Sequence, residues 1–110
     1  MYENKSRLLP TIEGVDIFYN PNDLNAQTLA MEVRNHIKKE TGIEPGLREI
    51  NPHFTAEYGT SPSCNLVVFI YTSSSIESST VVLSKHVTRE NVEKTKEELV
   101  KIISKYKPTK

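Results

Sequence analysis

The most hydrophobic stretch of the chain is residues 66–71, which reads Leu-Val-Val-Phe-Ile-Tyr and has no polar position. It is short, rich in β-branched and aromatic side chains, and bounded by serine-rich and proline-containing segments, which is typical of a strand. A strand without a polar face is covered on both sides. The pattern therefore predicts a central strand with apolar helix faces above and below it.

A strand followed by a helix is predicted upstream of this stretch. Residues 15–19 are apolar except for Asp16, and the polar turn at residues 20–23 ends that strand. Residues 24–41 form an amphipathic pattern that Asn22 or Asp23 can cap and that Gly42 ends. The apolar stripe of this predicted helix comprises Ala26, Leu29, Ala30, Val33 and Ile37.

Residues 47–50 predict a second extended segment, which Pro52 interrupts. Phe54, Ala56 and Tyr58 then alternate with polar residues, as in a half-exposed strand. Because proline donates no ladder hydrogen bond, we expect this segment at a sheet edge or bulge. An unpaired edge accepts a further strand, so these three residues are the candidate partner-binding residues.

The last part of the chain predicts a hairpin and a helix. Residues 72–80 read as a hydroxyl-rich connector, and residues 81–83 as a short strand. Thr88 is the expected cap of the final helix, with Glu90 in its first turn. The apolar stripe of that helix comprises Val92, Leu99, Ile103 and Tyr106 and ends before Pro108.

These elements predict one small α/β domain, with α+β as the alternative class. Its mixed sheet has four to five strands in the order β-α-β-(β)-β-β-α, and two amphipathic helices pack on it. A right-handed crossover through the first helix is the expected link between the first two strands. Residues 1–14 are assigned to an N-terminal arm, residues 15–107 to the domain and residues 108–110 to a tail.

Composition narrows the function classes. The chain has 110 residues, 14 basic and 14 acidic side chains, and an apolar fraction of 36%. Zero net charge gives no global attraction for nucleic acid or an anionic membrane, and the lean apolar content suggests a partner. The single cysteine, Cys64, favours a reducing compartment, so we expect a cytoplasmic protein. No signal-peptide or membrane-spanning pattern is present.

The pattern of residues 65–106 is a buried strand, a Ser and Glu loop, a short strand, a Thr cap and an amphipathic helix. It resembles the C-terminal part of the anticodon-binding domain of class II aminoacyl-tRNA synthetases. The resemblance implies RNA or ribosome contact, without transferring any family residue. Lys101, Lys105 and Lys107 lie in a basic C-terminal stretch and are the candidate polyanion-binding residues. A thioredoxin-like arrangement accommodates the same order of elements, but the chain lacks its Cys-x-x-Cys pair.

Catalytic chemistry is not indicated by any motif. The four glycines match no phosphate-binding spacing. His36, His53 and His86 are too far apart in sequence for a helix-borne zinc site. Cys64 lacks a recognisable nucleophile turn, so a plain buried or semi-buried thiol is predicted. We therefore predict no catalytic residue, no metal and no cofactor.

Three functions remain as hypotheses. The first is a non-enzymatic accessory or interaction module that acts through protein–protein contacts and self-associates or binds another protein. The alternative is an RNA- or ribosome-associated binding domain, and the third is a small enzyme whose site is not visible in the sequence.

Overall fold

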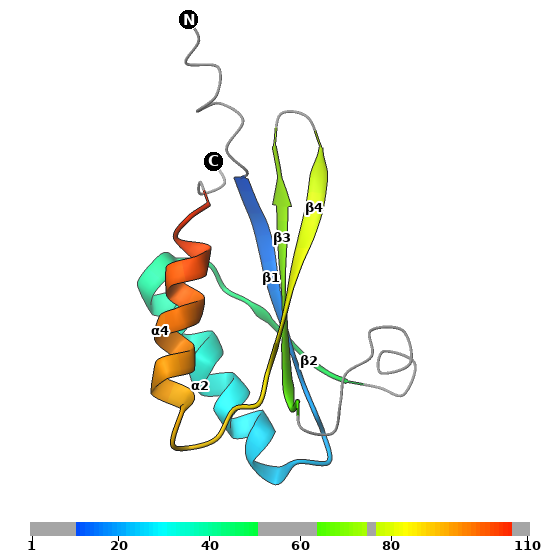
Figure 1. Ribbon diagram of the computed structural model, residues 1–110, viewed down its shortest axis with the longest axis vertical. Coiled ribbons are helices and arrows are strands. Elements are labelled where there is room, and N and C mark those ends of the chain that lie inside the picture. Colours follow the sequence, from blue (N-terminus) through cyan, green and yellow to red (C-terminus); the bar gives the residue numbers. More distant parts are fainter. Residues whose placement is uncertain (1–10, 51–63, 75–76, 107–110) are drawn as a thin grey trace, which may run out of the picture.

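The computed structural model describes residues 11–50, 64–74 and 77–106. It confirms the predicted fold class, because a four-stranded mixed sheet and two helices make up the described chain (Figure 1). The elements in chain order are β1 (Thr11–Tyr19), α2 (Leu24–Thr41), β2 (Gly46–Glu49), β3 (Leu66–Ser73), β4 (Ser78–Lys85) and α4 (Val92–Ile103).

The sheet has the strand order β2-β1-β3-β4. β1 and β2 are parallel and are joined through α2, whereas β1 with β3 and β3 with β4 are antiparallel. A parallel pair requires a crossover connection, and α2 supplies it. β3 lies between β1 and β4, so the predicted central position of the hydrophobic stretch is confirmed.

Both helices lie on the same face of the sheet, whereas the sequence suggested one helix on each side of β3 (Figure 1). Leu66, Val68 and Ile70 point to this face because alternate residues of a strand share a side. They pack in one cluster with the buried stripes of the two helices. Those stripes are Ala26, Leu29, Ala30, Val33 and Ile37 on α2, and Val92, Leu99 and Ile103 on α4.

The other face of β3 has a separate apolar cluster. Val67 and Phe69 are buried there together with Cys64, and Phe18, Ile50 and Tyr71 pack against them. The rings of Phe18 and Phe69 are tilted, with centroids 5.3 Å apart. The predicted two-sided burial of β3 is therefore confirmed, but α2 and α4 account for only one of its two faces.

β1 and β4 are longer than the sequence suggested. β1 begins at Thr11, within the stretch assigned to the arm. Its pairing with β3 continues across a register shift between Ile12 and Gly14, where β1 accommodates one extra residue. The shift places both Ile12 and Val15 in the helix-covered core. Much of the predicted connector at residues 72–80 is also strand, and the Thr72 and Ser79 hydroxyls are 2.9 Å apart across the β3–β4 pair.

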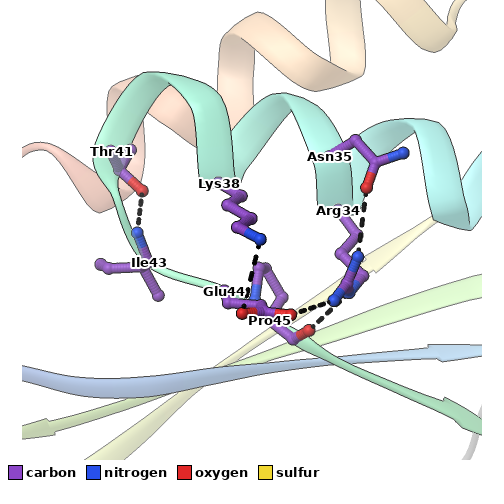
Figure 2. A network of polar contacts seen from close by, with 7 residues as sticks. All are labelled: Arg34, Asn35, Lys38, Thr41, Ile43, Glu44 and Pro45. Atoms are coloured by element: carbon purple, nitrogen blue, oxygen red, sulfur yellow. Dashed lines mark hydrogen bonds and ion pairs between the residues drawn. The ribbon is translucent and has the colours of Figure 1, made fainter.

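α2 begins and ends as predicted. The Asp23 carboxylate accepts a hydrogen bond from the Asn25 N–H at 3.0 Å, so Asp23 is the cap of the two residues considered. Gly42 has a φ of 81°, and its N–H donates to the Lys38 carbonyl. Figure 2 shows how the following loop is held: Arg34 donates to the Pro45 carbonyl at 3.0 Å and pairs with Glu44. These contacts direct the chain from α2 into β2.

The predicted cap of the final helix is wrong. α4 begins at Val92, with Asn91 in the cap position. Thr88 instead forms a turn with Asn91: the Thr88 N–H donates to the Asn91 side chain at 2.8 Å, and the Asn91 N–H donates to the Thr88 hydroxyl at 3.3 Å. Glu90 therefore precedes the helix, and Glu93 is the acidic residue of its first turn.

Replacing Val68 with Asp tests the core. Val68 has no exposed surface, so the substitution buries an unpaired charge, one of the costliest changes in a small domain. We expect loss of cooperative thermal unfolding, measured by circular dichroism. Val82→Asp is the matched control on β4, because Val82 is 43% exposed; a near-unchanged melt for Val68→Asp would contradict this architecture.

Candidate protein-binding edge

The candidate residues from the sequence are only partly placed by the structure. Phe54, Ala56, Tyr58 and Lys107 lie outside the described residues, so the structure does not test them. Lys101 belongs to α4 and Lys105 follows it, and both are exposed.

Lys101 lies beside carboxylates. It lines a shallow depression of about 390 Å³ with Lys94, Glu97 and Glu98. Two carboxylates between two lysines weaken the attraction of this surface for a polyanion.

The two edges of the described sheet differ in length and charge. β2 has four residues and includes Arg48 and Glu49, both exposed. β4 has eight residues, and none from Ser78 to Ser84 is charged or is proline. Short edges and charged edge residues are the usual means by which proteins prevent edge-to-edge pairing. Among the described strands, β2 has these features and β4 lacks them over most of its length.

The side chains of β4 divide between the core and the surface. Val81 and Leu83 are half-buried against the helix-covered core. Thr80, Val82 and Ser84 point to the opposite face and are exposed. On an antiparallel edge strand, alternate residues direct their N–H and C=O groups away from the neighbouring strand. This edge, β4 from Ser78 to Lys85, is the candidate binding site and is called the β4 edge below.

Sequence reasoning placed the edge at residues 54–58 and assigned only residues 81–83 to a strand here. A partial signal was present: from residue 72 to residue 85 the chain has no Gly, Pro, Asn or Asp, although serine, which is also common in turns, occurs six times. A nine-residue connector usually has at least one of the stronger turn residues Gly and Pro. The segment instead favours two long strands and a short hairpin turn.

Asn65 links the start of β3 to the end of β4. This buried residue precedes β3, and its amide donates to the Val87 carbonyl at 3.0 Å and to the Asp23 carboxylate at 3.0 Å. Its side-chain oxygen accepts from the Val87 N–H at 2.8 Å. Its backbone N–H donates to the Lys85 carbonyl, and its carbonyl accepts from the Asn20 N–H. One asparagine thus joins the start of α2, the end of β1 and the end of β4.

Asp23 at the cap of α2 and Glu32 within α2 each bind groups from other segments. The Asn65 amide and the Asn25 N–H lower the pKa of Asp23 below its usual 3.8. Arg89, 2.6 Å from Glu32, and Lys96, 3.7 Å away, lower the pKa of Glu32. Both carboxylates have evident structural partners, which link α2 to the segments around β3 and α4.

The remaining chemical groups do not form a reactive cluster within the described residues. Cys64 is buried, in agreement with the predicted buried or semi-buried thiol, and it donates to the Leu66 carbonyl at 3.4 Å. No group of three His, Cys, Asp or Glu residues suited to a metal is found in the described ranges.

A cavity of about 210 Å³ lies near the ends of both helices. Its described lining has three hydroxyl groups but no carboxylate, imidazole or thiol, and comprises Ile12, Thr41, Ile43, Ile103, Ser104 and Tyr106.

Comparison with known proteins finds no matching family model, no similar curated protein and no similar solved structure. The resemblance to anticodon-binding domains therefore stays a prediction. Neither described helix is long and apolar enough to cross a membrane.

Replacing Asn65 with Ala tests the hydrogen-bond network at the start of β3. The change leaves the buried Val87 N–H and C=O without their Asn65 partners, and we expect a loss of about 2–3 kcal/mol in the free energy of unfolding. Chemical denaturation measures it. Asn35→Ala, an exposed asparagine on α2, is the control and should change stability by less than about 0.5 kcal/mol. Equal effects of the two substitutions would contradict the role of Asn65.

The pKa of Asp23 predicts acid sensitivity. Because the folded-state pKa lies below 3.8, ionised Asp23 favours the folded state. Its contribution is present above about pH 4 and is lost as the pH falls through the folded-state pKa. Asp23→Ala should therefore lose less stability than wild type between about pH 5 and pH 2. Asn22→Ala, in the same turn, should keep the wild-type slope; parallel curves for Asp23→Ala and wild type would oppose this assignment.

Proposed function

We propose that the protein is a non-enzymatic interaction module that acts through protein–protein contacts as an accessory subunit. The observation that carries the proposal is the β4 edge, an eight-residue edge strand that is uncharged from Ser78 to Ser84. A strand added there gains main-chain hydrogen bonds from groups that point away from β3.

The chemistry of the strand also supports a protein partner. Val82 leaves apolar surface on the outermost strand of the described sheet, and the flanking Thr80 and Ser84 are neutral. A neutral edge suits another strand better than it suits a phosphate backbone, which is bound mainly by lysine and arginine. The lone buried cysteine is consistent with a reducing compartment, so we assign this role to the cytoplasm.

RNA or ribosome contact remains the weaker alternative, and it depends on the resemblance and on the C-terminal lysines. Carboxylates accompany Lys94 and Lys101 on α4, so no described surface favours this reading over the protein-binding one. Weak, strongly salt-dependent RNA affinity that is lost in Lys101→Gln would support it.

The test of the proposed function compares three chains, each expressed in the native organism with its natural partners present. They are wild type, Val82→Lys, and Met31→Lys as the matched control. Met31 is 46% exposed and belongs to α2, not to a strand of the sheet. Native mass of the purified particles should exceed that of one chain for wild type and for Met31→Lys. It should fall to that of one chain for Val82→Lys, because an edge lysine opposes strand addition.

A wild-type particle with the mass of a single chain would contradict the proposal. So would a larger particle that Val82→Lys leaves intact, because the β4 edge would then have no part in the assembly.

A further inference from the structure

Val82 is one of three large apolar side chains that are exposed in the described chain. The other two, Leu24 and Met31, belong to α2, so Val82 is the one of the three on the sheet. It lies opposite Phe69 on the face away from the helices, and 43% of its surface is exposed. A strand that paired with β4 would cover this valine.

The order of side chains along β4 is nearly symmetric about Val82. Consider two copies of β4 that pair antiparallel about a two-fold axis perpendicular to the sheet. Each face of the sheet then continues from one copy into the other, so residues that lie opposite each other point to the same face. With the axis at Val82, that valine lies opposite itself and Val81 lies opposite Leu83 of the second copy. Thr80 then lies opposite Ser84, and Ser79 opposite Lys85.

This register matches apolar with apolar and hydroxyl with hydroxyl. Cross-strand pairs of like chemistry stabilise a sheet, whereas like charges directly opposite destabilise it. The one charged residue of β4, Lys85, lies opposite a serine and not opposite its own copy. Moving the axis to Val81 would instead place Ser79 opposite Leu83 and Thr80 opposite Val82, so Val82 is the better centre.

The helix beside the strand is compatible with a second copy. Lys85 pairs with Glu98 of α4 at 2.7 Å, so α4 lies near the β4 edge on the helix-covered face. Its exposed surface there has two positive and two negative side chains, Lys94, Lys101, Glu97 and Glu98. With Lys85 this surface has three positive and two negative side chains, a net charge of +1, so two such surfaces brought near each other meet little like-charge repulsion.

We propose that the partner at the β4 edge is a second copy of this chain, an inference that rests on the proposed function. The two β4 strands pair antiparallel about a two-fold axis at Val82, and the described sheets of both copies join into one continuous sheet.

The experiment uses the full chain produced alone in a heterologous host, with no native partner present. Wild type and the control Met31→Lys should sediment as dimers at micromolar concentration. Val82→Lys and Val82→Glu should each be monomeric, with a dissociation constant raised at least about tenfold, because each places like charges opposite one another at the axis. Cooperative thermal melts and a far-ultraviolet circular dichroism spectrum like that of wild type would show that the variants are folded, with a midpoint below that of the dimer.

Mixing the two variants in equal amounts is the decisive step. Lysine of one copy then lies opposite glutamate of the other, so a Val82→Lys/Val82→Glu heterodimer should form with close to wild-type affinity. Failure of the mixture to associate would overturn the register at Val82.

A wild-type chain that is monomeric at high micromolar concentration when produced alone would overturn self-pairing altogether. If the native particle is nevertheless larger and Val82→Lys disrupts it, the proposed function stands and another protein occupies the edge. If the native particle is also a single chain, both proposals are wrong.

Discussion

The structure depends on one constraint: β3 has no polar face, and its backbone must be paired on both sides. β1 and β4 supply the hydrogen bonds, and the two helices cover the side with Val68. At the start of β3 the polar residue Asn65 is also buried. Its N–H, its carbonyl and both polar side-chain atoms nevertheless have hydrogen-bond partners. A buried polar group is tolerated only when it is satisfied in this way.

The position of β3 also determines which strands remain at the edges. Four strands in the order β2-β1-β3-β4 leave β2 and β4 outermost in the described sheet. β2 combines a short length with Arg48 and Glu49, whereas β4 extends for eight residues with its first charge at Lys85. Among the described residues, the asymmetry between the two edges is the feature that distinguishes one surface from the others.

The elements that the sequence predicted well were those whose signal is local. α2 follows from its apolar stripe, from Asp23 and from Gly42, and β3 follows from an unbroken apolar run. One kind of error arose where a long-range contact decides the structure, because the β1 bulge near Gly14 requires pairing with β3. The cap error has a local cause: Thr88 bonds with Asn91, three residues later, and a threonine side chain can serve either such a turn or a helix cap. Edge position is a property of the whole sheet, so Val82 could not be identified from residues 81–83 alone.

The alternation of β4 separates the residues that stabilise the core from those of the proposed binding edge. Val81 and Leu83 belong to the core, so their identity is constrained by packing with the helix-covered cluster. Val82 points to the other side and has much of its surface in solvent, so a charge there costs the fold little while it changes what the edge can pair with. An edge lysine at this position would be a simple protection against unwanted pairing. The valine that occupies it is therefore easier to understand as part of an interface than as a requirement of the isolated domain.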